Sequence, residues 1–384
     1  MKLKRVGKIW KLFRWVITYP ATSLGKRFYV LCDYVRLYKK QGIMPNEYYE
    51  FEFEKRSDEF RNSFLGVNEQ RFYLDFLNPQ KYYILARNKF LSHNVLEKTG
   101  VRKSELYCYY QPEGCVLSST QVANNVSSVF EVLKNKNVDS CVIKTTESSH
   151  GDNVIVVTHI DYIENDCILH YFDGEKRKLS SVLSEYPLIF ESLVRQTDQL
   201  SLFNPSSINT VRFMTTLYPN GEAKIIATFI KIGRKGKCVD NAGRGGNVDA
   251  CIDIETGALK YTIQYDGWRK IKSITHHPDS GNIIEGVVID HWQEIKEQVI
   301  KFQQSFPYIK AAGWDIAITN EGPLVIEVND MWDRTGQYFI RRGWRNEIRD
   351  CYFAWKKINA SYPFERPSNQ LNNKHLDRIV KNER

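Results

Sequence analysis

The sequence predicts an α+β protein whose C-terminal half is built on an antiparallel sheet. Two stretches carry this prediction. Residues 209–265 contain short segments of alternating apolar and polar residues, separated by the turn pairs Asn220-Gly221 and Thr256-Gly257, and this pattern indicates meandering antiparallel strands. Residues 313–330, GWDIAITNEGPLVIEVND, contain two more β-like runs around an Asn-Glu-Gly turn signal and predict a hairpin. Helical segments elsewhere complete the class.

The remaining elements follow from periodicity and from start and stop signals. Residues 81–100 are expected to form a short strand and then a helix that stops at Gly100, and residues 291–306 a helix that ends before Pro307. The other predicted elements, in chain order, are a charged helix at 45–66, two apolar strands around a polar loop at 140–160, a helix at 176–186, a strand at 187–190 and a helix at 337–358. The polar residues 365–384 are expected to form a loose tail.

Length and composition exclude several classes of protein. A chain of 384 residues, 42% of them hydrophobic, is long enough for two or three domains and is not disordered throughout. It lacks an apolar run of about 18 residues, the length that a membrane-spanning helix needs. Lys8, Lys11 and Arg14 interrupt the apolar residues of the N-terminus, so no secretion signal is predicted. Eight scattered cysteines without a CxxC pair indicate reduced thiols. Together these features predict a cytoplasmic protein.

Positive charge is concentrated at the N-terminus. Residues 1–40 hold eleven Lys or Arg and a single acid, Asp33, and this excess accounts for the whole net charge of +9. Trp10, Phe13 and Trp15 are interleaved among these cations, a combination typical of a helix that lies on an anionic membrane surface. A helix packed on the chain's own domain and a partner-binding arm are alternatives. Because the rest of the chain is nearly neutral, nucleic acid is not expected as a partner.

Three candidate metal ligands lie in the hairpin of residues 313–330. Apolar and polar residues alternate in PLVIEVND, so Glu327 and Asn329 point to the same face of their strand. If the hairpin is centred on Glu321, Asp315 lies opposite Glu327. Two carboxylates that face each other across a strand pair repel, and a bound cation is the simplest remedy. Two carboxylates and an amide oxygen suit a hard ion such as Mg²⁺. The alternative is an exposed hairpin with scattered polar residues.

Three further segments contain candidate anion-binding residues. In residues 141–157, Lys144 leaves a strand before a polar, glycine-containing turn and a return strand, the pattern of a flap whose backbone amides can hold phosphate oxygens. In residues 206–213, SSINTVRF, Arg212 follows polar residues within a sheet segment. Residues 231–249 form a glycine-rich basic loop whose polar residues suit contact with an anion: Asp240, Asn241 and Arg244. The plainer alternatives are a hairpin with a surface lysine, an exposed strand arginine and an ordinary flexible loop.

Five short motifs occur along the chain in a fixed order. They are SINTVRFMT (207–215), KIG (231–233), DNAGRGG (240–246), HPDSG (277–281) and WDIAITNEGPLVIEVN (314–329). With this order the chain resembles the ATP-grasp ligases and, more narrowly, the sugar-transfer-associated ATP-grasp family. That family has the succession SxNTxRxxT, R/K-x-G, DN…GG, HP-x-x-G and WDxAxT…GPxxxExN. The resemblance extends from about Tyr48 to about Trp355, and five ordered motifs argue against a chance match.

The resemblance implies roles for individual residues. Lys89 and Lys144 correspond to the two nucleotide-binding lysines, and Arg212 to the arginine that contacts the γ-phosphate and the acyl phosphate. The flap over the phosphates corresponds to residues 149–152, with Ser149, Gly151 and Asp152 as its candidate contacts. The hinge whose backbone reads the adenine edge corresponds to Glu191, Ser192, Leu193 and Val194. The implied Mg²⁺ ligands are Asp315, Glu327 and Asn329, and the other candidate catalytic residues are Lys231, Asp240, Asn241 and Arg244.

The resemblance also implies an ATP-grasp fold, with the nucleotide between a small flap domain and a larger antiparallel-sheet domain. The expected domains are a basic amphipathic arm at 1–44, an N-terminal helical region at 45–105, the flap subdomain at 106–195, the C-terminal catalytic subdomain at 196–360 and a polar tail at 361–384.

The chain departs from the pattern of the family at three places. The flap reads SSHGDN without a run of glycines, Lys231 stands where an arginine with bidentate phosphate contact is usual, and DMWDRTGQ after Asn329 is bulky and charged. None removes a metal ligand or Arg212, so an active enzyme is expected.

The activity that the resemblance implies is ATP-dependent, ADP-forming ligation of a carboxylate to an amine through an acyl phosphate, with ATP and Mg²⁺. The implied substrates are a carboxylate-bearing sugar or amino acid and an amine, in the assembly of a surface polysaccharide such as a capsule. Two alternatives are a kinase of a glycan or small molecule on the same fold and a non-catalytic, membrane-associated scaffold. The expected location is the cytoplasm, at the inner face of the membrane if residues 1–40 bind it.

Overall fold

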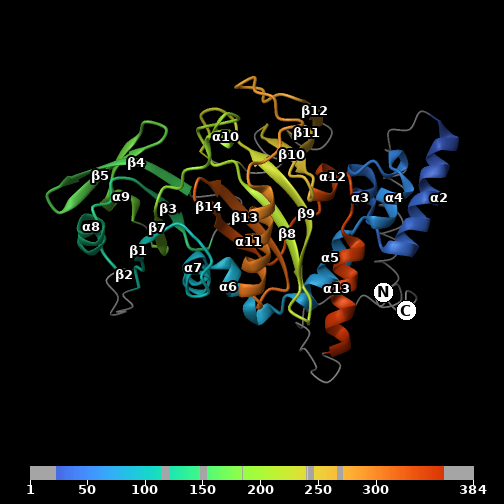
Figure 1. Cartoon of the computed structure of the whole chain (residues 1–384), viewed down its shortest axis with the longest axis horizontal. Coiled ribbons are helices and arrows are strands. Elements are labelled where there is room, and N and C mark those ends of the chain that lie inside the picture. The colour runs from blue at the N-terminus through green and yellow to red at the C-terminus, as the bar shows by residue number, and fades with distance from the viewer. Residues whose placement is uncertain are drawn as a thin grey trace, which may run out of the picture. The chain divides into compact units, whose positions relative to one another are not determined.

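A computed structural model of the chain describes residues 23–113, 122–147, 154–183, 185–238, 240, 246–265 and 271–358. The chain divides into two compact units: unit 1 comprises residues 1–77 and 333–384, and unit 2 comprises residues 78–332 (Figure 1). The described part of unit 1 is helical, whereas unit 2 contains two sheets. Within the described residues, no helix has both the length and the apolar character needed to cross a membrane.

Unit 1 is held together by aromatic packing and buried ion pairs. Arg345 forms a buried ion pair with Glu69, with Nη2 2.9 Å from Oε1, and Tyr352 packs against three aromatic rings from the Glu69 helix. Gly343 permits a close approach of two backbones, because a Cβ there would lie 1.9 Å from the carbonyl oxygen of Ser63. The helices of unit 1 are α2 (Leu24–Gln41), α3 (Pro45–Glu50), η1 (Phe53–Lys55), α4 (Asp58–Ser63), α5 (Val67–Leu77), α12 (Gly336–Phe339) and α13 (Arg345–Ile358).

The helix predicted at 45–66 is wrong as a single element. Glu52 has a left-handed backbone, with φ 51°, so the chain turns between α3 and η1. Ser57 then caps α4, because its hydroxyl accepts a hydrogen bond from the amide of Phe60 at 3.2 Å. The helix predicted at 337–358 is likewise divided, into α12 and α13, and Arg341 between them has φ 53°. Local backbone conformation, which the apolar pattern does not encode, breaks both helices.

Helix α2 covers the second half of the predicted N-terminal arm and packs against its own unit. Val30, Tyr34 and Leu37 are buried. Asp33 is buried as well, and its carboxylate accepts hydrogen bonds from the Arg61 guanidinium and from the Tyr48 hydroxyl. For this segment the intramolecular alternative therefore holds. Residues 1–22 of the arm lie outside the described residues.

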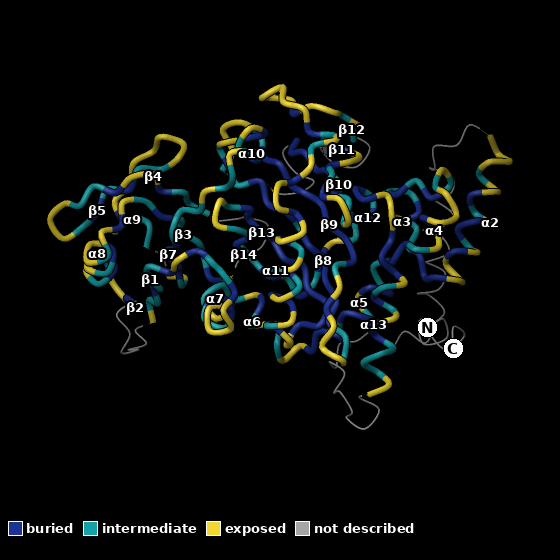
Figure 2. The backbone as a smooth tube through the Cα atoms, in the orientation of Figure 1, coloured by how far each residue is buried: buried dark blue, intermediate teal, exposed yellow. Residues whose placement is uncertain are grey.

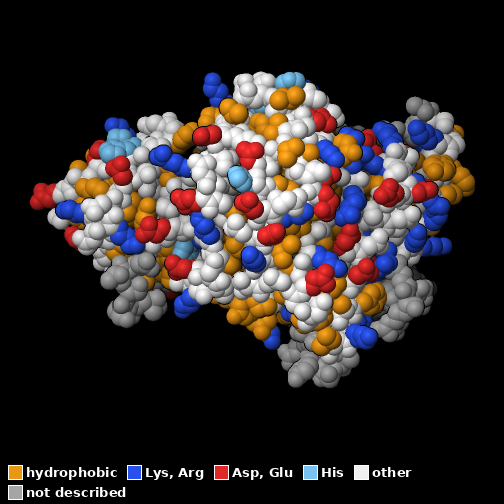
Figure 3. Space-filling view, viewed as in Figure 1, with side chains coloured by type: hydrophobic (Ala, Val, Ile, Leu, Met, Phe, Trp, Pro, Cys, Tyr) orange, Lys and Arg blue, Asp and Glu red, His pale blue; other side chains and the backbone are white. Residues whose placement is uncertain are grey.

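The outer face of α2 exposes apolar side chains beside cations. Leu24 is 86% exposed and Phe28 67% exposed, and Tyr29 follows them on the same helix. Figure 3 shows apolar side chains next to Lys and Arg over this helix. Such a surface is amphipathic, although the buried face of α2 is already occupied.

The first sheet of unit 2 has seven strands in the order β2-β1-β7-β3-β4-β5-β6. Its strands are β1 (Leu106–Tyr110), β2 (Val122–Ala123), β3 (Cys141–Thr145), β4 (Val154–Ile163), β5 (Asp166–Tyr171), β6 (Lys176–Lys178) and β7 (Leu188–Glu191). β1 and β2 are parallel, and the other pairs are antiparallel. Its hydrophobic core includes residues from α8 (Val126–Asn135) and α9 (Leu179–Val182).

The strand pair predicted around the polar loop of 140–160 is confirmed as β3 and β4, and the predicted strand at 187–190 is confirmed as β7. The helix predicted at 176–186 is wrong. Its first residues form the edge strand β6, which pairs with β5. Only the short α9 follows, where the Ser180 hydroxyl donates to Asp166 at 2.7 Å. Pairing with β5 overrides the helical tendency of this charged segment.

The second sheet is antiparallel, in the order β12-β11-β10-β9-β8-β13-β14. Its strands are β8 (Val211–Leu217), β9 (Ala223–Ile232), β10 (Val248–Ile252), β11 (Leu259–Tyr265), β12 (Ile271–Ser273), β13 (Ala311–Thr319) and β14 (Gly322–Asn329). Helix α11 (Trp292–Ser305) packs on one face, where Trp292 stacks on Phe213 with ring centroids 5.4 Å apart. Figure 2 shows the central strands as buried. The predicted meander, hairpin and helix are confirmed.

A helical segment precedes the first sheet. Residues 81–100 were predicted to begin with a strand, but they form η2 (Gln80–Tyr82), α6 (Tyr83–Arg87) and α7 (Lys89–Lys98). Tyr82, Leu85 and Ala86 pack on the core of the second sheet, and this spacing is helical rather than alternating. The Arg87 guanidinium forms a bidentate pair with Asp330, at 2.9 and 2.8 Å. This pair ties α6 to the end of β14. A short α10 (Asp198–Ser201) follows β7.

Candidate active site

A row of charged side chains crosses the polar face of the second sheet. Asp315 on β13 lies opposite Glu327 on β14 and, on its other side, opposite Arg212 on β8. Residues that are directly opposite in neighbouring strands point to the same face. Trp314 and Ile316, on either side of Asp315, belong to the hydrophobic core to which α11 contributes. Alternation thus sends the apolar side chains to α11 and the charges to the other face.

The predicted pairing of Asp315 with Glu327 is confirmed, although the turn of the hairpin and the register next to it differ from the prediction. The hairpin closes with Thr319 opposite Gly322, so its turn is shorter than assumed. An irregularity next to Ile326 then restores the Asp315–Glu327 pair. Because of this bulge, Ile326 is only partly buried and the predicted alternation fails there.

Cations surround the Asp315 carboxylate. Arg212 donates to it through Nε and Nη2, at 2.7 and 2.8 Å, and the Lys231 ammonium lies 2.9 Å from Oδ1. Burial alone would raise the pKa of Asp315, but Arg212 and Lys231 outweigh it and hold the pKa well below its usual range. These cations offset the repulsion between Asp315 and Glu327. From the sequence, a bound metal ion was expected to offset it. The Arg212 side chain is only 15% exposed, so the alternative of an exposed strand arginine is wrong.

Lys231 and Asp240 extend the charged row. Lys231 on β9 is buried, and burial opposes its charge while Asp315 and Asp240 raise its pKa. Asp240 accepts two hydrogen bonds from Thr210, from the amide at 2.7 Å and from the hydroxyl at 2.5 Å. Burial raises the pKa of Asp240. Asp240 is therefore held against the residue that precedes β8. The other two candidates of this loop, Asn241 and Arg244, lie outside the described residues.

The nucleotide-binding candidates of the first sheet form a second charged group. The Lys144 ammonium lies 2.7 Å from Oε2 of Glu191, and Nδ1 of His93 lies 3.8 Å from Oε1. Burial opposes the charge of Glu191, but Lys144, His93 and Lys103 together hold its pKa well below its usual range. Lys144 is thus largely committed to Glu191. The flap candidates Ser149, Gly151 and Asp152 lie outside the described residues.

The predicted hinge is partly occupied by other contacts. The Ser192 amide donates to the Glu105 carbonyl at 2.8 Å, and the Ser192 hydroxyl accepts from the Glu105 amide at 2.9 Å. The backbone amide of Ser192 is therefore engaged with the chain itself. Leu193 and Val194, both partly buried, follow it.

Two more lysines lie within electrostatic reach of these groups. The amide of Lys89 donates to the Thr146 carbonyl at 2.9 Å, so the start of α7 contacts the end of β3. Burial lowers the pKa of Lys89, against the opposing effect of Glu327. Burial also lowers the pKa of Lys103, which Glu191 and Glu327 oppose. Lys103 was missed in the sequence, because VRKSEL has no periodicity or turn signal that sets this lysine apart.

The metal-ligand candidates offer oxygen donors from one face. The Asn329 side-chain amide lies 3.5 Å from Oδ2 of Asp315, which agrees with the shared face predicted for the three residues. Two carboxylates and one amide suit a hard cation. Within the described residues, no group of three or more His, Cys, Asp or Glu is arranged to hold a metal, and an ion at Asp315 would share that carboxylate with Arg212 and Lys231.

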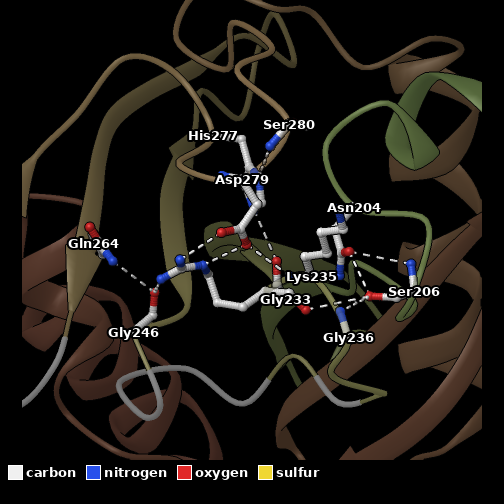
Figure 4. A network of polar contacts seen from close by, with 11 residues as sticks. Asn204, Ser206, Gly233, Lys235, Gly236, Gly246, Gln264, His277, Asp279 and Ser280 are labelled. Carbon is white, nitrogen blue, oxygen red and sulfur yellow. Dashed lines mark hydrogen bonds and ion pairs between the residues drawn. The ribbon is translucent and has the colours of Figure 1, made fainter. Parts of the chain in front are cut away.

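A polar network joins the other motifs at the end of β9 (Figure 4). Arg234 forms a bidentate pair with Asp279, at 2.7 Å for both contacts. His277 accepts at Nδ1 from the amides of Asp279 and Ser280, so its proton is on Nε2, which donates to the Gly233 carbonyl at 3.0 Å. Burial lowers the pKa of His277. The HPDSG motif and Gly233 of the KIG motif therefore hold each other in place, whereas Lys231 of KIG contacts Asp315 in the charged row.

The SxNT motif is structural for the same reason. Asn209 is fully buried. Its side-chain oxygen accepts from the Gly233 amide at 3.2 Å, and its side-chain nitrogen donates to the Leu200 carbonyl at 2.9 Å. Gly233 must be glycine here, because a Cβ would lie 2.2 Å from the Ser207 hydroxyl oxygen. These contacts set the starting point of β8 and thereby the position of Arg212.

The model of the family described as sugar-transfer associated ATP-grasp matches residues 68–350. No curated protein matches the chain. Among solved structures, N5-carboxyaminoimidazole ribonucleotide synthetase from Thermotoga maritima is 11% identical over 72% of this chain and 52% of its own, with a TM-score of 0.39. Biotin carboxylase from Campylobacter jejuni is 8% identical over 72% and 48%, with a TM-score of 0.42. D-alanine–D-alanine ligase from Bacillus anthracis is 15% identical over 72% and 70%, with a TM-score of 0.38. The chain spans about half the length of the first two.

Proposed function

Because the chain belongs to the sugar-transfer associated ATP-grasp family and has the ATP-grasp fold, we propose that it is an ATP-dependent carboxylate–amine ligase. One observation carries the proposal. Arg212, Asp315 and Glu327 lie side by side on the polar face of the second sheet, with the lysines of the nucleotide region within electrostatic reach of Glu327. This arrangement supports the proposal, because binding of a polyphosphate with its metal ion requires cations and oxygen ligands close together.

Arg212 suits contact with the transferred phosphoryl group. Its Nε and Nη2 are fixed by Asp315, which orients the guanidinium plane. Within the described residues, Nη1 makes no hydrogen bond, and the bare backbone of Gly313 lies beside it, where a Cβ would be 3.4 Å away. A donor that is already oriented costs no reorganisation when charge develops on the phosphoryl oxygens. Asp315 is therefore the positioning residue for Arg212.

In the proposed reaction, an oxygen of the substrate carboxylate attacks the γ-phosphorus of ATP in line, and the bond to the β–γ bridging oxygen breaks. The products are an acyl phosphate and ADP. An amine then attacks the acyl carbon, inorganic phosphate leaves, and the amine loses a proton. Mg²⁺ held by Asp315, Glu327 and Asn329 would neutralise phosphate charge. The residues of the chain contribute position and charge, through Arg212, Lys231 and the lysines near Glu191.

The test is a hydroxylamine trap. The protein, ATP, Mg²⁺ and a panel of carboxylated sugars and amino acids are incubated with hydroxylamine, which converts an acyl phosphate to a hydroxamate. Hydroxamate together with ADP supports the ligase. ADP without hydroxamate, and with a phosphorylated hydroxyl compound, would instead indicate a kinase. Absence of ATP binding in calorimetry would contradict both and favour a scaffold.

The substrate class and location are further parts of the proposal. The name of the family suggests a role linked to sugar transfer, so a carboxylated sugar or an amino acid joined to a sugar amine during polysaccharide assembly is the first candidate. A cytoplasmic protein that touches the inner face of the membrane would fit such a role. The cations of residues 1–22 and the exposed Leu24 and Phe28 on α2 support membrane contact.

A further inference from the structure

Lys103 is a partly buried lysine that has no role in the proposed reaction. Its Nζ lies 3.5 Å from the Ile326 carbonyl oxygen, and within the described residues this is its only hydrogen bond. The charged groups that act on it most strongly are Glu191 and Lys144, followed by Glu327 and Lys89. Lys103 therefore lies between the carboxylate at the end of β7 and the strand that carries the candidate metal ligands.

The backbone holds Lys103 in this position. Residues 99–105 link α7 to β1, and Lys103 forms a parallel bridge with Val325 on β14. The Val325 amide donates to the Arg102 carbonyl at 2.9 Å. The Arg102 guanidinium in turn donates to the Thr319 hydroxyl at 2.9 Å. These contacts fix the backbone of Lys103 beside the bulge at Ile326, and its pairing with β14 therefore sets the direction of the lysine side chain.

The balance of charge distinguishes Lys103 from Lys144. Lys144 is paired with Glu191 at 2.7 Å, whereas the closest polar partner of Lys103 is a neutral carbonyl at 3.5 Å. A partly buried ammonium whose hydrogen bond goes to a neutral carbonyl, with the carboxylates of Glu191 and Glu327 acting on it only at longer range, has lost part of its hydration without full compensation. An anion that arrives next to it would supply the missing counter-charge. The site thus contains a lysine whose charge is available to a ligand.

We propose that Lys103 is a third nucleotide-binding lysine, which contacts a phosphate group of the nucleotide, while Lys144 chiefly balances Glu191. This inference rests on the proposed function, since it takes an adenine nucleotide as the ligand. It differs from the assignment by resemblance, in which Lys89 and Lys144 are the two lysines of the nucleotide site.

The experiment compares nucleotides that differ in phosphate content. Binding of adenosine, AMP, ADP and ATP with Mg²⁺ is measured by calorimetry, with competition for the weak ligands. The variants are Lys103→Met, Lys103→Arg and the matched control Lys98→Met, whose lysine is exposed at the end of α7. Lys103→Met should weaken the binding of ADP and ATP by ~10–100-fold, the range expected for a charged hydrogen bond. Adenosine binding should change by less than about twofold, Lys103→Arg should recover part of the loss, and Lys98→Met should behave as wild type.

Stability without ligand gives an independent readout. Lys103→Met should leave the melting temperature unchanged or raise it, because it removes an incompletely compensated charge from a partly buried position. Lys144→Met should lower the melting temperature, because it removes the partner of buried Glu191.

Several outcomes would overturn the inference. Equal loss of adenosine and ADP binding in Lys103→Met would give the residue a structural or base-reading role, and unchanged binding of all four ligands would remove it from the site. Both would leave the proposed function standing. Wild-type protein that binds none of the nucleotides would overturn the proposed function and this inference with it.

Discussion

Asp315 is the residue on which the charges of the candidate active site depend. Its carboxylate is shared by Arg212 and Lys231, two cations that would otherwise be buried without it. Glu327, directly opposite, adds negative charge to the same face and has a different environment, since it acts on Lys89 and Lys103 across the site. Neutralising Asp315 and neutralising Glu327 should therefore change the free energy of unfolding by different amounts.

The first prediction separates these carboxylates by substitution. Glu327→Gln removes the repulsion across the strand pair, so the free energy of unfolding should stay the same or rise slightly. Asp315→Asn leaves the buried Lys231 and the largely buried Arg212 without their partner, so the free energy of unfolding should fall by ~3 kcal/mol or more. Urea unfolding followed by circular dichroism measures both.

Activity gives the second half of this test. Both variants should lose more than about nine tenths of the turnover, which corresponds to ~1.4 kcal/mol in the barrier. A variant that keeps more would show that its carboxylate is not a metal ligand. Equal stability of the two variants would show that Asp315 is not the counter-ion described above.

The second prediction concerns Arg212. If this guanidinium stabilises charge that develops during phosphoryl transfer, Arg212→Lys should lower kcat much more than it raises the KM for ATP. Lysine keeps one charge but loses the two-point contact with Asp315 that orients the group. Steady-state kinetics at saturating carboxylate measures the split. An unchanged kcat would place Arg212 outside the reaction.

The third prediction concerns His277, which is neutral in the network with Arg234 and Asp279. Its pKa is lowered from about 6.5, so the unfolded chain binds a proton that the folded chain resists. The stability contributed by this group is therefore present above pH ~6.5 and is lost as the pH falls below it. The pKa of the paired Asp279 is also lowered, so protonation of Asp279 reduces the stability only at more acidic pH.

Denaturant unfolding at pH 7.5 and pH 5 tests this sign. His277→Gln should be less stable than wild type at pH 7.5 and should lose less stability on acidification. The neighbouring exposed His276 provides the control, and His276→Gln should keep the wild-type pH dependence. A wild-type-like slope in His277→Gln would mean that other groups cause the acid sensitivity.

At the scale of elements, helix α2 divides the basic N-terminal segment into two parts with different physical roles. From Val30 onward its inner face belongs to the core of unit 1, and Asp33 balances the buried Arg61. The exposed start of α2, with Leu24 and Phe28, does not belong to that core. If the arm binds a membrane, as proposed above, the residues of α2 from Val30 onward are excluded from that contact by their packing.

The fourth prediction follows from this division. Deletion of residues 1–22 should leave the melting temperature and ATP binding unchanged and should abolish binding to anionic vesicles, with about 1 kcal/mol contributed by each Lys or Arg near the surface. Deletion of residues 1–41 should unfold or strongly destabilise unit 1, because it removes Val30, Asp33 and Leu37. Vesicle sedimentation and thermal unfolding measure the two effects.

A charge-preserving variant serves as the control. Replacement of Trp10, Phe13 and Trp15 by Ala should weaken vesicle binding at high salt, where electrostatic attraction is screened and insertion remains. Full-length protein that ignores anionic vesicles would contradict the membrane proposal. Stable, folded protein after deletion of residues 1–41 would contradict the packing role of α2.

At the scale of the whole molecule, the alternation of apolar and polar residues along the strands could be predicted from the sequence, whereas the local backbone geometry could not. The Asp315–Glu327 pair and the antiparallel meander followed from period-2 patterns that the hydrophobic core enforces. The strand predicted at the start of 81–100 and the single helix predicted at 45–66 failed, because tertiary packing of Leu85 and the positive φ of Glu52 override the pattern. The place of Lys103 in the site could not be predicted from the sequence, because it depends on a bulge in a strand more than two hundred residues away.

The Arg102–Lys103 segment also matters for the edges of the sheets. Strand β14 is the last strand of the second sheet, and an uncovered last strand offers unpaired N–H and C=O groups to any other extended chain. Here the Val325 amide is already taken by Arg102. One of the two outer strands of the first sheet, β6, carries three exposed cations instead, Lys176, Arg177 and Lys178. Loss of the Arg102 contacts should therefore appear first as aggregation of an otherwise folded protein.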